Sequence, residues 1–311
     1  MSSQADRLPV GIVPPELVAF AERLADVAGE KIAPLFRDPS LSVRDKSTTG
    51  TFDPVTEADR RSEQAMRDLI QECYPTHGVI GEEFPATRAD AEFVWVLDPV
   101  DGTKSFVTGT YGFGTLVGLC QNGAPILGVL NQPVLNERWL GVRGCQTLLN
   151  GQPISTRRCA AVSTAALFTH DPLCPDALPP AETSAGYQKL MGSARFKRFS
   201  QDCIAYGVLA AGCADIVVEA LQWPWDYIPL IPIVSGAGGA LVGWDGSELM
   251  LDRSGPSKTS VVAVGDKDML PEVVSMLGGD ADESVGEAVS MLRALGFVTP
   301  RSARDHVPAD G

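Results

Sequence analysis

Five short apolar segments constrain the fold more than any other feature of the sequence. They lie at residues 78–81, 93–97, 114–120, 126–130 and 138–142, with Gly, Pro and polar residues between them. Short apolar runs bounded by turn residues are typical of β-strands. Because the connections are too short for crossover helices, the sequence predicts a largely antiparallel sheet.

Two amphipathic helices are expected before this sheet. Apolar residues recur at spacings of three and four over residues 15–36, which predicts a helix there. Thr56-Glu57-Ala58-Asp59 has the form of a capping box, in which a hydroxyl and an acid satisfy backbone groups of the first turn. A second helix is therefore predicted over residues 56–73.

The second half of the chain repeats the order of helices followed by strands. After the turn signal at residues 150–151, the sequence predicts a buried helix at 200–212, strands at 214–219 and 261–264, an apolar run at 227–240 and a helix at 269–276. This order indicates an α/β (α+β) layered architecture. We expect an N-terminal α+β subdomain at 1–150, a C-terminal α/β subdomain at 151–277 and a tail at 278–311.

Composition excludes several classes of function. The chain has 311 residues, of which 44% are hydrophobic, and 25 basic against 39 acidic residues give a net charge of −14. This acidity argues against a nucleic-acid partner. No apolar run approaches the length of about 20 residues that spans a membrane. With seven cysteines but no CxxC pair, and no signal-peptide pattern, a cytoplasmic protein with reduced thiols is expected.

The segment Asp98-Pro99-Val100-Asp101-Gly102-Thr103 carries the strongest chemical signal. Two carboxylates, Asp98 and Asp101, stand where an apolar strand gives way to a turn. Gly102 lets backbone amides approach an anion, and Thr103 adds a hydroxyl. Mg²⁺ prefers such oxygen ligands together with a substrate phosphate. Taken alone, the segment fits a metal site and a solvent-exposed turn equally well.

Other acidic residues have structural explanations of their own. Glu82 and Glu83 follow the apolar run at 78–81 and are also consistent with solvated loop charge. Asp226 precedes an apolar run, and Asp59 opens a predicted helix, so both are also consistent with helix capping.

Taken together, the motifs resemble the inositol monophosphatase family of Mg²⁺-dependent, lithium-sensitive phosphatases. They are TEAD at 56–59, GEE at 81–83, DPVDGT at 98–103, and WD at 225–226 followed by AGG at 237–239. The resemblance covers roughly residues 15 to 275. It implies an αβαβα layered sandwich and a homodimer.

The resemblance also implies roles for individual residues. The implied ligands of two Mg²⁺ ions are Glu82, Asp98, the carbonyl of Val100, Asp101 and Asp226. Asp59 and Glu83 match positions around the attacking water and a third, weaker ion, so two or three ions are expected, with Li⁺ as an inhibitor. The implied catalytic residues are Asp59, Thr103 and Glu82, with Thr103 and Asp59 orienting the water. The amides of Gly102 and Thr103 match the phosphate cradle.

Within the family, the chain is similar to the histidinol-phosphate phosphatase branch. DPVDGTKSFVTG at 98–109 and QDCIAYGVLAAG at 201–212 carry this similarity. It implies a substrate site at Ser200, Gln201, Asp202 and Glu219. Two carboxylates facing a cationic aminoalcohol form charge-assisted hydrogen bonds. Asp202 is also consistent with a helix cap and Glu219 with a strand-end surface acid.

Some positions depart from the pattern of this branch. Ser200-Gln201 stands where the branch usually has Gly-Gly, and Pro229 lies three residues after Asp226, in a first turn that tolerates proline. His77, His170 and His306 lack the spacing of metal ligands and are assigned no role.

The sequence therefore predicts a Mg²⁺-dependent phosphatase whose partner is a small phosphorylated metabolite. The expected reaction converts histidinol phosphate to histidinol in histidine biosynthesis. Two alternatives stay open. One is a phosphatase for another small monoester, such as an inositol phosphate, a nucleotide 3′-phosphate or a specialised-pathway intermediate. The other is a catalytically silent homologue that binds a ligand.

Overall fold

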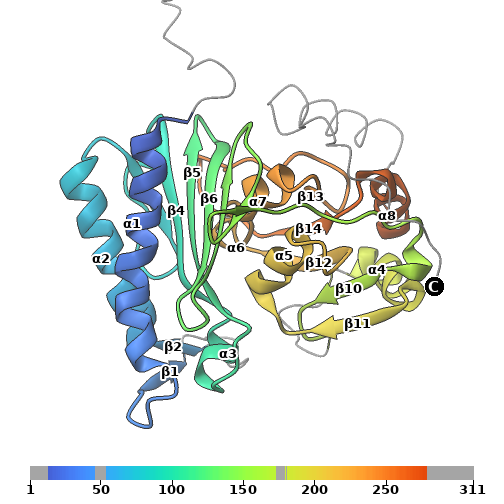
Figure 1. Ribbon diagram of the computed structural model, residues 1–311, viewed down its shortest axis with the longest axis horizontal. Helices are drawn as coiled ribbons and strands as arrows, with labels where there is room; N and C mark the ends of the chain where they lie inside the picture. Colours follow the sequence, from blue (N-terminus) through green and yellow to red (C-terminus); the bar gives the residue numbers. More distant parts are fainter. Residues whose placement is uncertain (1–12, 46–53, 173–178, 180, 279–311) are drawn as a thin grey trace, which may run out of the picture.

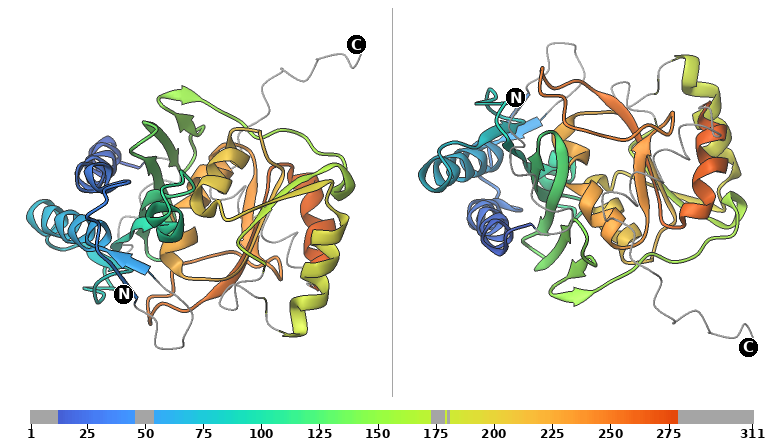
Figure 2. Two further views of the ribbon diagram at one scale, coloured as in Figure 1. Left: turned by 90° about the horizontal axis from the view of Figure 1, so that it is seen from below. Right: turned by 90° about the horizontal axis from the view of Figure 1, so that it is seen from above.

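The computed structural model describes residues 13–45, 54–172, 179 and 181–278. Two β-sheets stand side by side with helices between them and on both outer faces (Figures 1 and 2). The five layers alternate helix, sheet, helix, sheet, helix, so the expected αβαβα sandwich is confirmed. No helix in these residues is long and apolar enough to cross a membrane. The six cysteines described are free thiols.

The first sheet has seven strands in the order β3-β4-β5-β6-β7-β8-β9. Their bounds are β3 Gly78–Gly81, β4 Phe93–Asp101, β5 Gly114–Gln121, β6 Ala124–Gln132, β7 Glu137–Val142, β8 Leu148–Leu149 and β9 Gln152–Pro153. All neighbours are antiparallel except β3 and β4. The predicted strands are confirmed, and β4 extends beyond its predicted end to Asp101.

Helices α1 (Pro15–Ile32) and α2 (Glu57–Cys73) cover the outer face of this sheet (Figure 2). The predicted capping box is present, because the Thr56 amide donates to Asp59 Oδ2 at 2.9 Å and the Ala58 amide donates to the Thr56 hydroxyl. Helix α1 ends earlier than predicted, at Ile32, and a 3₁₀ turn continues to Leu35. Two short strands, β1 (Val43–Asp45) and β2 (Pro54–Thr56), precede α2.

The second sheet has five strands in the order β11-β10-β12-β14-β13. Their bounds are β10 Ala166–Thr169, β11 Phe196–Phe199, β12 Ile216–Gln222, β13 Ala240–Gly243 and β14 Thr259–Val264. Helices α4 (Ala181–Ser193) and α8 (Leu270–Leu277) cover its outer face (Figure 2). Strands β10, β11 and β13 and helix α4 were not predicted. The subdomain boundary after residue 150 stays a prediction. Of the tail predicted at 278–311, Gly278 caps α8 and the rest lies outside the described residues.

Helices α5 (Asp202–Ala210), α6 (Pro224–Tyr227) and α7 (Leu230–Gly236) form the middle layer. The sequence predicts that the helix tolerates Pro229, but the structure divides it into α6 and α7 at a turn that includes this residue. Proline has no amide to donate to a continuous helix. This turn packs closely on the first sheet. A Cβ at Gly128 would overlap the Pro229 carbonyl, and a Cβ at Gly141 would overlap the Ile233 backbone.

We expect Gly128→Ala to destabilise the protein by about 2–3 kcal/mol, because the added methyl group forces α7 away from β6. The matched control is Gly192→Ala in α4, where a Cβ meets nothing within 4 Å. That change should stabilise the protein by up to about 1 kcal/mol through helix propensity. Urea unfolding of both variants measures the difference, and equal effects would contradict the close packing of α7 on the sheet.

Candidate active site

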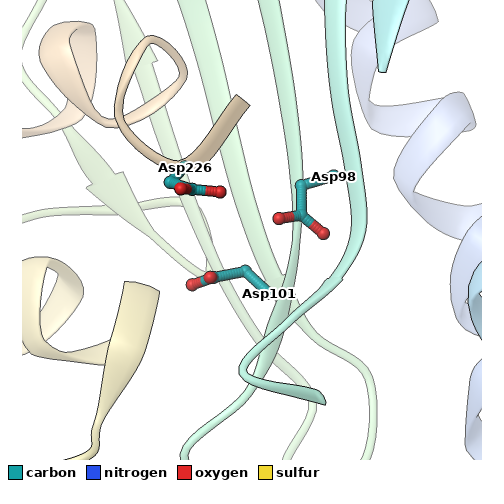
Figure 3. Close-up of side chains that lie close together, drawn as sticks. All are labelled: Asp98, Asp101 and Asp226. Carbon is teal, nitrogen blue, oxygen red and sulfur yellow. The ribbon is translucent and has the colours of Figure 1, made fainter. Parts of the chain in front are cut away.

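Three carboxylates meet between the first sheet and the middle helices. Asp98, Asp101 and Asp226 each offer an oxygen atom, and these oxygens lie within 4.8 Å of one another. Figure 3 shows Asp98 and Asp101 at the end of β4 and Asp226 on the facing α6. The structure thus brings together residues that lie up to 128 positions apart in the sequence, the separation of Asp98 and Asp226 (226 − 98).

Local hydrogen bonds fix the turn that carries the first two carboxylates. Asp98 Oδ1 accepts the Val100 amide at 3.0 Å, and the Thr103 hydroxyl donates to the Val100 carbonyl at 3.0 Å. Gly102 has φ +86°, and a Cβ there would also overlap the Gly112 carbonyl. Glycine is therefore required at this position.

Asp226 has two roles in the structure. Its Oδ2 accepts the Trp223 amide at 2.8 Å, so it caps the first turn of α6 as one sequence alternative proposed. The same carboxylate faces Asp98 and Asp101 (Figure 3). Helix capping and a place in the carboxylate cluster are thus compatible.

Burial of these acids favours their neutral forms. Asp98 is 2% exposed. Burial, reinforced by the charges of Glu82 and Asp101, raises the pKa of Asp98 well above its usual range. Burial and the charges of Asp101 and Glu82 raise the pKa of Asp226 well above its usual range. Burial raises the pKa of Asp101 to about 7. By accessible surface Asp98 is buried and Asp101 and Asp226 are partly buried. A donor set of clustered carboxylate oxygens with little exposure to water fits a hard divalent cation, whose charge offsets the repulsion.

Asp59 and Thr103 lie beside this cluster. The Thr103 hydroxyl is 3.5 Å from Asp59 Oδ1, and Asp59 is fully buried. Burial raises the pKa of Asp59 to about 6 despite the hydrogen bonds from Thr56 that oppose the shift. Asp59 therefore also combines capping with a place at the candidate site.

The loop between β3 and β4 brings Glu82 and Glu83 to the same region. The charge of Glu82 contributes to the raised pKa of Asp98 and of Asp226, and that of Glu83 contributes to the raised pKa of Asp59. The Glu83 carboxylate lies 3.9 Å from the Arg60 guanidinium.

A pocket opens next to the cluster. Its lining residues are Asp101, Asp202, Cys203, Tyr206, Glu219, Gln222 and Asp226. Helix α5 closes one side, where the Cys203 amide donates to Asp101 Oδ2 at 2.6 Å. Asp202 and Glu219 thus share a pocket with two of the clustered carboxylates.

Ser200 and Gln201 are not among these lining residues. Gln201 donates its side-chain amide to the Ser200 carbonyl at 3.1 Å. Ser200 has φ +54° and Asp202 has φ +42°, so both occupy the left-handed region. Glycine adopts this backbone conformation more readily than residues with a side chain.

His170 is a site residue that the sequence did not reveal. Its Nδ1 lies 3.0 Å from Asp202 Oδ1, and its backbone amide donates to Glu219 Oε2 at 3.1 Å. Burial lowers the pKa of His170, but the hydrogen bond to Asp202 and the charges of Asp202 and Glu219 outweigh it and raise the pKa to about 9. His170 follows β10, which pairs in parallel with β12, and no spacing signal links these residues.

Comparisons with known proteins identify the family. Residues 14–275 match the model of the inositol monophosphatase family. The chain belongs to this family. Its fold and its class as a phosphomonoesterase follow from that membership, and the acidic cluster is consistent with the family's use of Mg²⁺.

Three known phosphatases illustrate the similarity. The chain is 39% identical to "Bifunctional phosphatase IMPL2, chloroplastic" of Arabidopsis thaliana, over 83% of this chain and 74% of the relative. It is 34% identical to a histidinol-phosphatase of Chlorobaculum parvum, over 76% of this chain and 89% of that protein. A solved inositol monophosphatase from Zymomonas mobilis has 38% identity and a TM-score of 0.73, covering 85% of this chain and 98% of that one.

We expect Mg²⁺ to stabilise the protein more at high pH than at low pH. The raised pKa values mean that the metal-free folded protein keeps protons between about pH 4 and pH 7 that the unfolded chain has released, so its stability falls as pH rises through that window. Mg²⁺ binding requires the deprotonated acids and is favoured as pH rises.

Thermal unfolding with Mg²⁺ and with EDTA measures this linkage. The increase in Tm on adding Mg²⁺ should be larger by about 3 °C or more at about pH 8 than at about pH 5.5. An equal increase at both pH values would contradict a site made of these acids.

Proposed function

We propose that the chain is a Mg²⁺-dependent phosphatase for a small phosphomonoester with a cationic group, and that histidinol phosphate is its substrate. The observation that carries this proposal is the pocket in which Asp202 and Glu219 lie next to the carboxylate cluster. The histidinol-phosphatase relatives support it. A homodimer and a cytoplasmic location belong to the same proposal, although the Arabidopsis relative is named as chloroplastic.

The metal-binding residues in this proposal are Glu82, Asp98, the Val100 carbonyl, Asp101 and Asp226, with Glu83 and Asp59 near a third ion. Two or three Mg²⁺ ions there would neutralise the phosphate and lower the pKa of an attacking water, and Li⁺ would inhibit. The Thr103 hydroxyl donates to the Val100 carbonyl, so its oxygen would be free to accept a proton of this water, and Asp59 Oδ1, 3.5 Å from the same hydroxyl, would help to orient the water toward the ester. The amides of Gly102 and Thr103 bind the phosphate oxygens.

The position of Asp202 suits an ammonium group close to the ester. One of its oxygens is held by His170, and a Cβ at Gly102 would come within 3.0 Å of the other. That second oxygen therefore lies over the phosphate-binding turn. In histidinol phosphate the ammonium is on the carbon next to the ester CH₂ group, so it can pair with Asp202 while the imidazole extends toward Glu219.

The similarity to inositol monophosphatases makes inositol phosphates the second candidate class of substrate. An inositol phosphate has no cationic group, so Asp202 and Glu219 would not contribute charge-assisted bonds to it. The complete set of acids that the chemistry requires argues against a silent homologue.

Phosphate release from a substrate panel tests the proposal. The panel holds histidinol phosphate, inositol 1-phosphate, adenosine 3′,5′-bisphosphate and fructose 1,6-bisphosphate, each with Mg²⁺ and with EDTA. We expect Mg²⁺-dependent activity with kcat/KM for histidinol phosphate about 100-fold above the others, which is about 2.7 kcal/mol in transition-state free energy. Comparable or greater activity on another substrate would contradict the assignment of histidinol phosphate. Absence of activity on all four substrates would contradict the assignment of phosphatase activity.

Asp202→Asn separates charge recognition from the chemistry. It should raise KM for histidinol phosphate by about 10-fold or more while leaving any activity on inositol 1-phosphate unchanged. The control is Asp26→Asn, which replaces an exposed carboxyl on α1. It should change neither KM for histidinol phosphate nor the activity on inositol 1-phosphate.

A further inference from the structure

Glu63 is a buried carboxylate that the proposed chemistry does not use. Its side chain is 0% exposed, and it lies on α2 four residues after Asp59. Arg67 follows four residues later, and its guanidinium Nε donates to Glu63 Oε1 at 2.8 Å. Residues four apart share one face of a helix, so Asp59, Glu63 and Arg67 form a row.

This row reaches the loop that carries Glu82 and Glu83. The Glu83 amide donates to Glu63 Oε2 at 2.8 Å. A Cβ at Gly81 would overlap the Glu63 carboxylate, so glycine at residue 81 leaves the space that this carboxylate occupies. Both Glu63 oxygens are therefore occupied, one by the helix and one by the loop.

Arg67 extends the contact along the loop. Its guanidinium donates to the Phe84 carbonyl at 3.0 Å and to the Pro85 carbonyl at 3.1 Å. Backbone groups of residues 83, 84 and 85 are thus all held by two side chains of α2. The ring of Phe84 also lies under the guanidinium groups of Arg60, at 4.7 Å, and Arg67, at 5.8 Å.

Stability alone is a weak explanation for this pair. Replacing a buried ion pair with apolar side chains of similar volume is often neutral or stabilising. The directional contacts of Glu63 and Arg67 instead fix the loop backbone at residues 83–85. The same loop carries Glu82 and Glu83, whose charges raise the pKa values of Asp98 and Asp59. A loop already fixed in place loses less entropy when a cation binds.

We propose that Glu63 and Arg67 are positioning residues that hold the loop at residues 81–85 in the geometry that divalent-cation binding requires. This inference rests on the proposed metal-dependent function. One rigid helix, α2, then places both Asp59 and the Glu82-Glu83 loop against the end of β4.

Binding of Mn²⁺ to the substrate-free protein, followed by electron paramagnetic resonance, tests the inference with a readout that does not depend on turnover. The variants are Glu63→Gln and the double variant Glu63→Gln with Arg67→Met, which leaves no unpaired buried charge if the single variant is poorly folded. Each should weaken Mn²⁺ binding by about 10-fold to 100-fold, as loss of outer-shell partners typically does. Hydrogen exchange at residues 82–84 should quicken in the metal-free variants, while KM for the phosphoester at saturating Mg²⁺ stays unchanged.

The control is a matched pair on the same helix. Glu57 and Arg61 form an exposed ion pair at the same spacing, so Glu57→Gln with Arg61→Met should leave Mn²⁺ binding and loop exchange as in the parent. Folded Glu63 variants with unchanged Mn²⁺ affinity would overturn the inference, even if loop exchange quickens. Failure of the proposed function is distinguishable, because the parent protein itself would then bind no Mn²⁺ or release no phosphate.

Discussion

Mutual repulsion among buried carboxylates is the constraint on which the rest of the site depends. Oxygen atoms of the buried Asp98 and the partly buried Asp101 and Asp226 lie within 4.8 Å of one another, with little water to stabilise their charges. Burying an ionised group is costly unless a proton or a cation compensates it. The raised pKa values of these acids express that cost, and a divalent cation is the compensation that phosphoryl chemistry can use.

The layers of the fold bring the acids together from separate elements. Strand β4 supplies Asp98 and Asp101, and α6 supplies Asp226 from across the interface. The approach of these elements depends on the glycines of the sheet, because the backbone around Pro229 packs where a Cβ of Gly128 would be. Helix α2 contributes Asp59 directly and fixes the Glu82-Glu83 loop through Glu63. Packing and site geometry therefore rest on the same contacts.

Features with a local signal could be predicted from the sequence. The strands between residues 78 and 142, the capping box at Thr56 and the turn at Asp98 each depend on neighbouring residues, and the structure contains all of them. Strand β10 and His170 depend on parallel pairing with β12, nearly 50 residues away, and no periodicity reveals that. Pro229 lies between α6 and α7 because it has no amide to donate to a continuous helix. The roles of the site residues came from resemblance and stay predictions.

Anomalous diffraction from crystals grown with Mn²⁺ and phosphate tests the central claim most directly, because it locates the cation independently of turnover. The account predicts Mn²⁺ peaks bounded by the carboxylates of Asp98, Asp101 and Asp226, with phosphate over the Gly102 turn. Mn²⁺ peaks elsewhere, with none beside these three carboxylates, would contradict it.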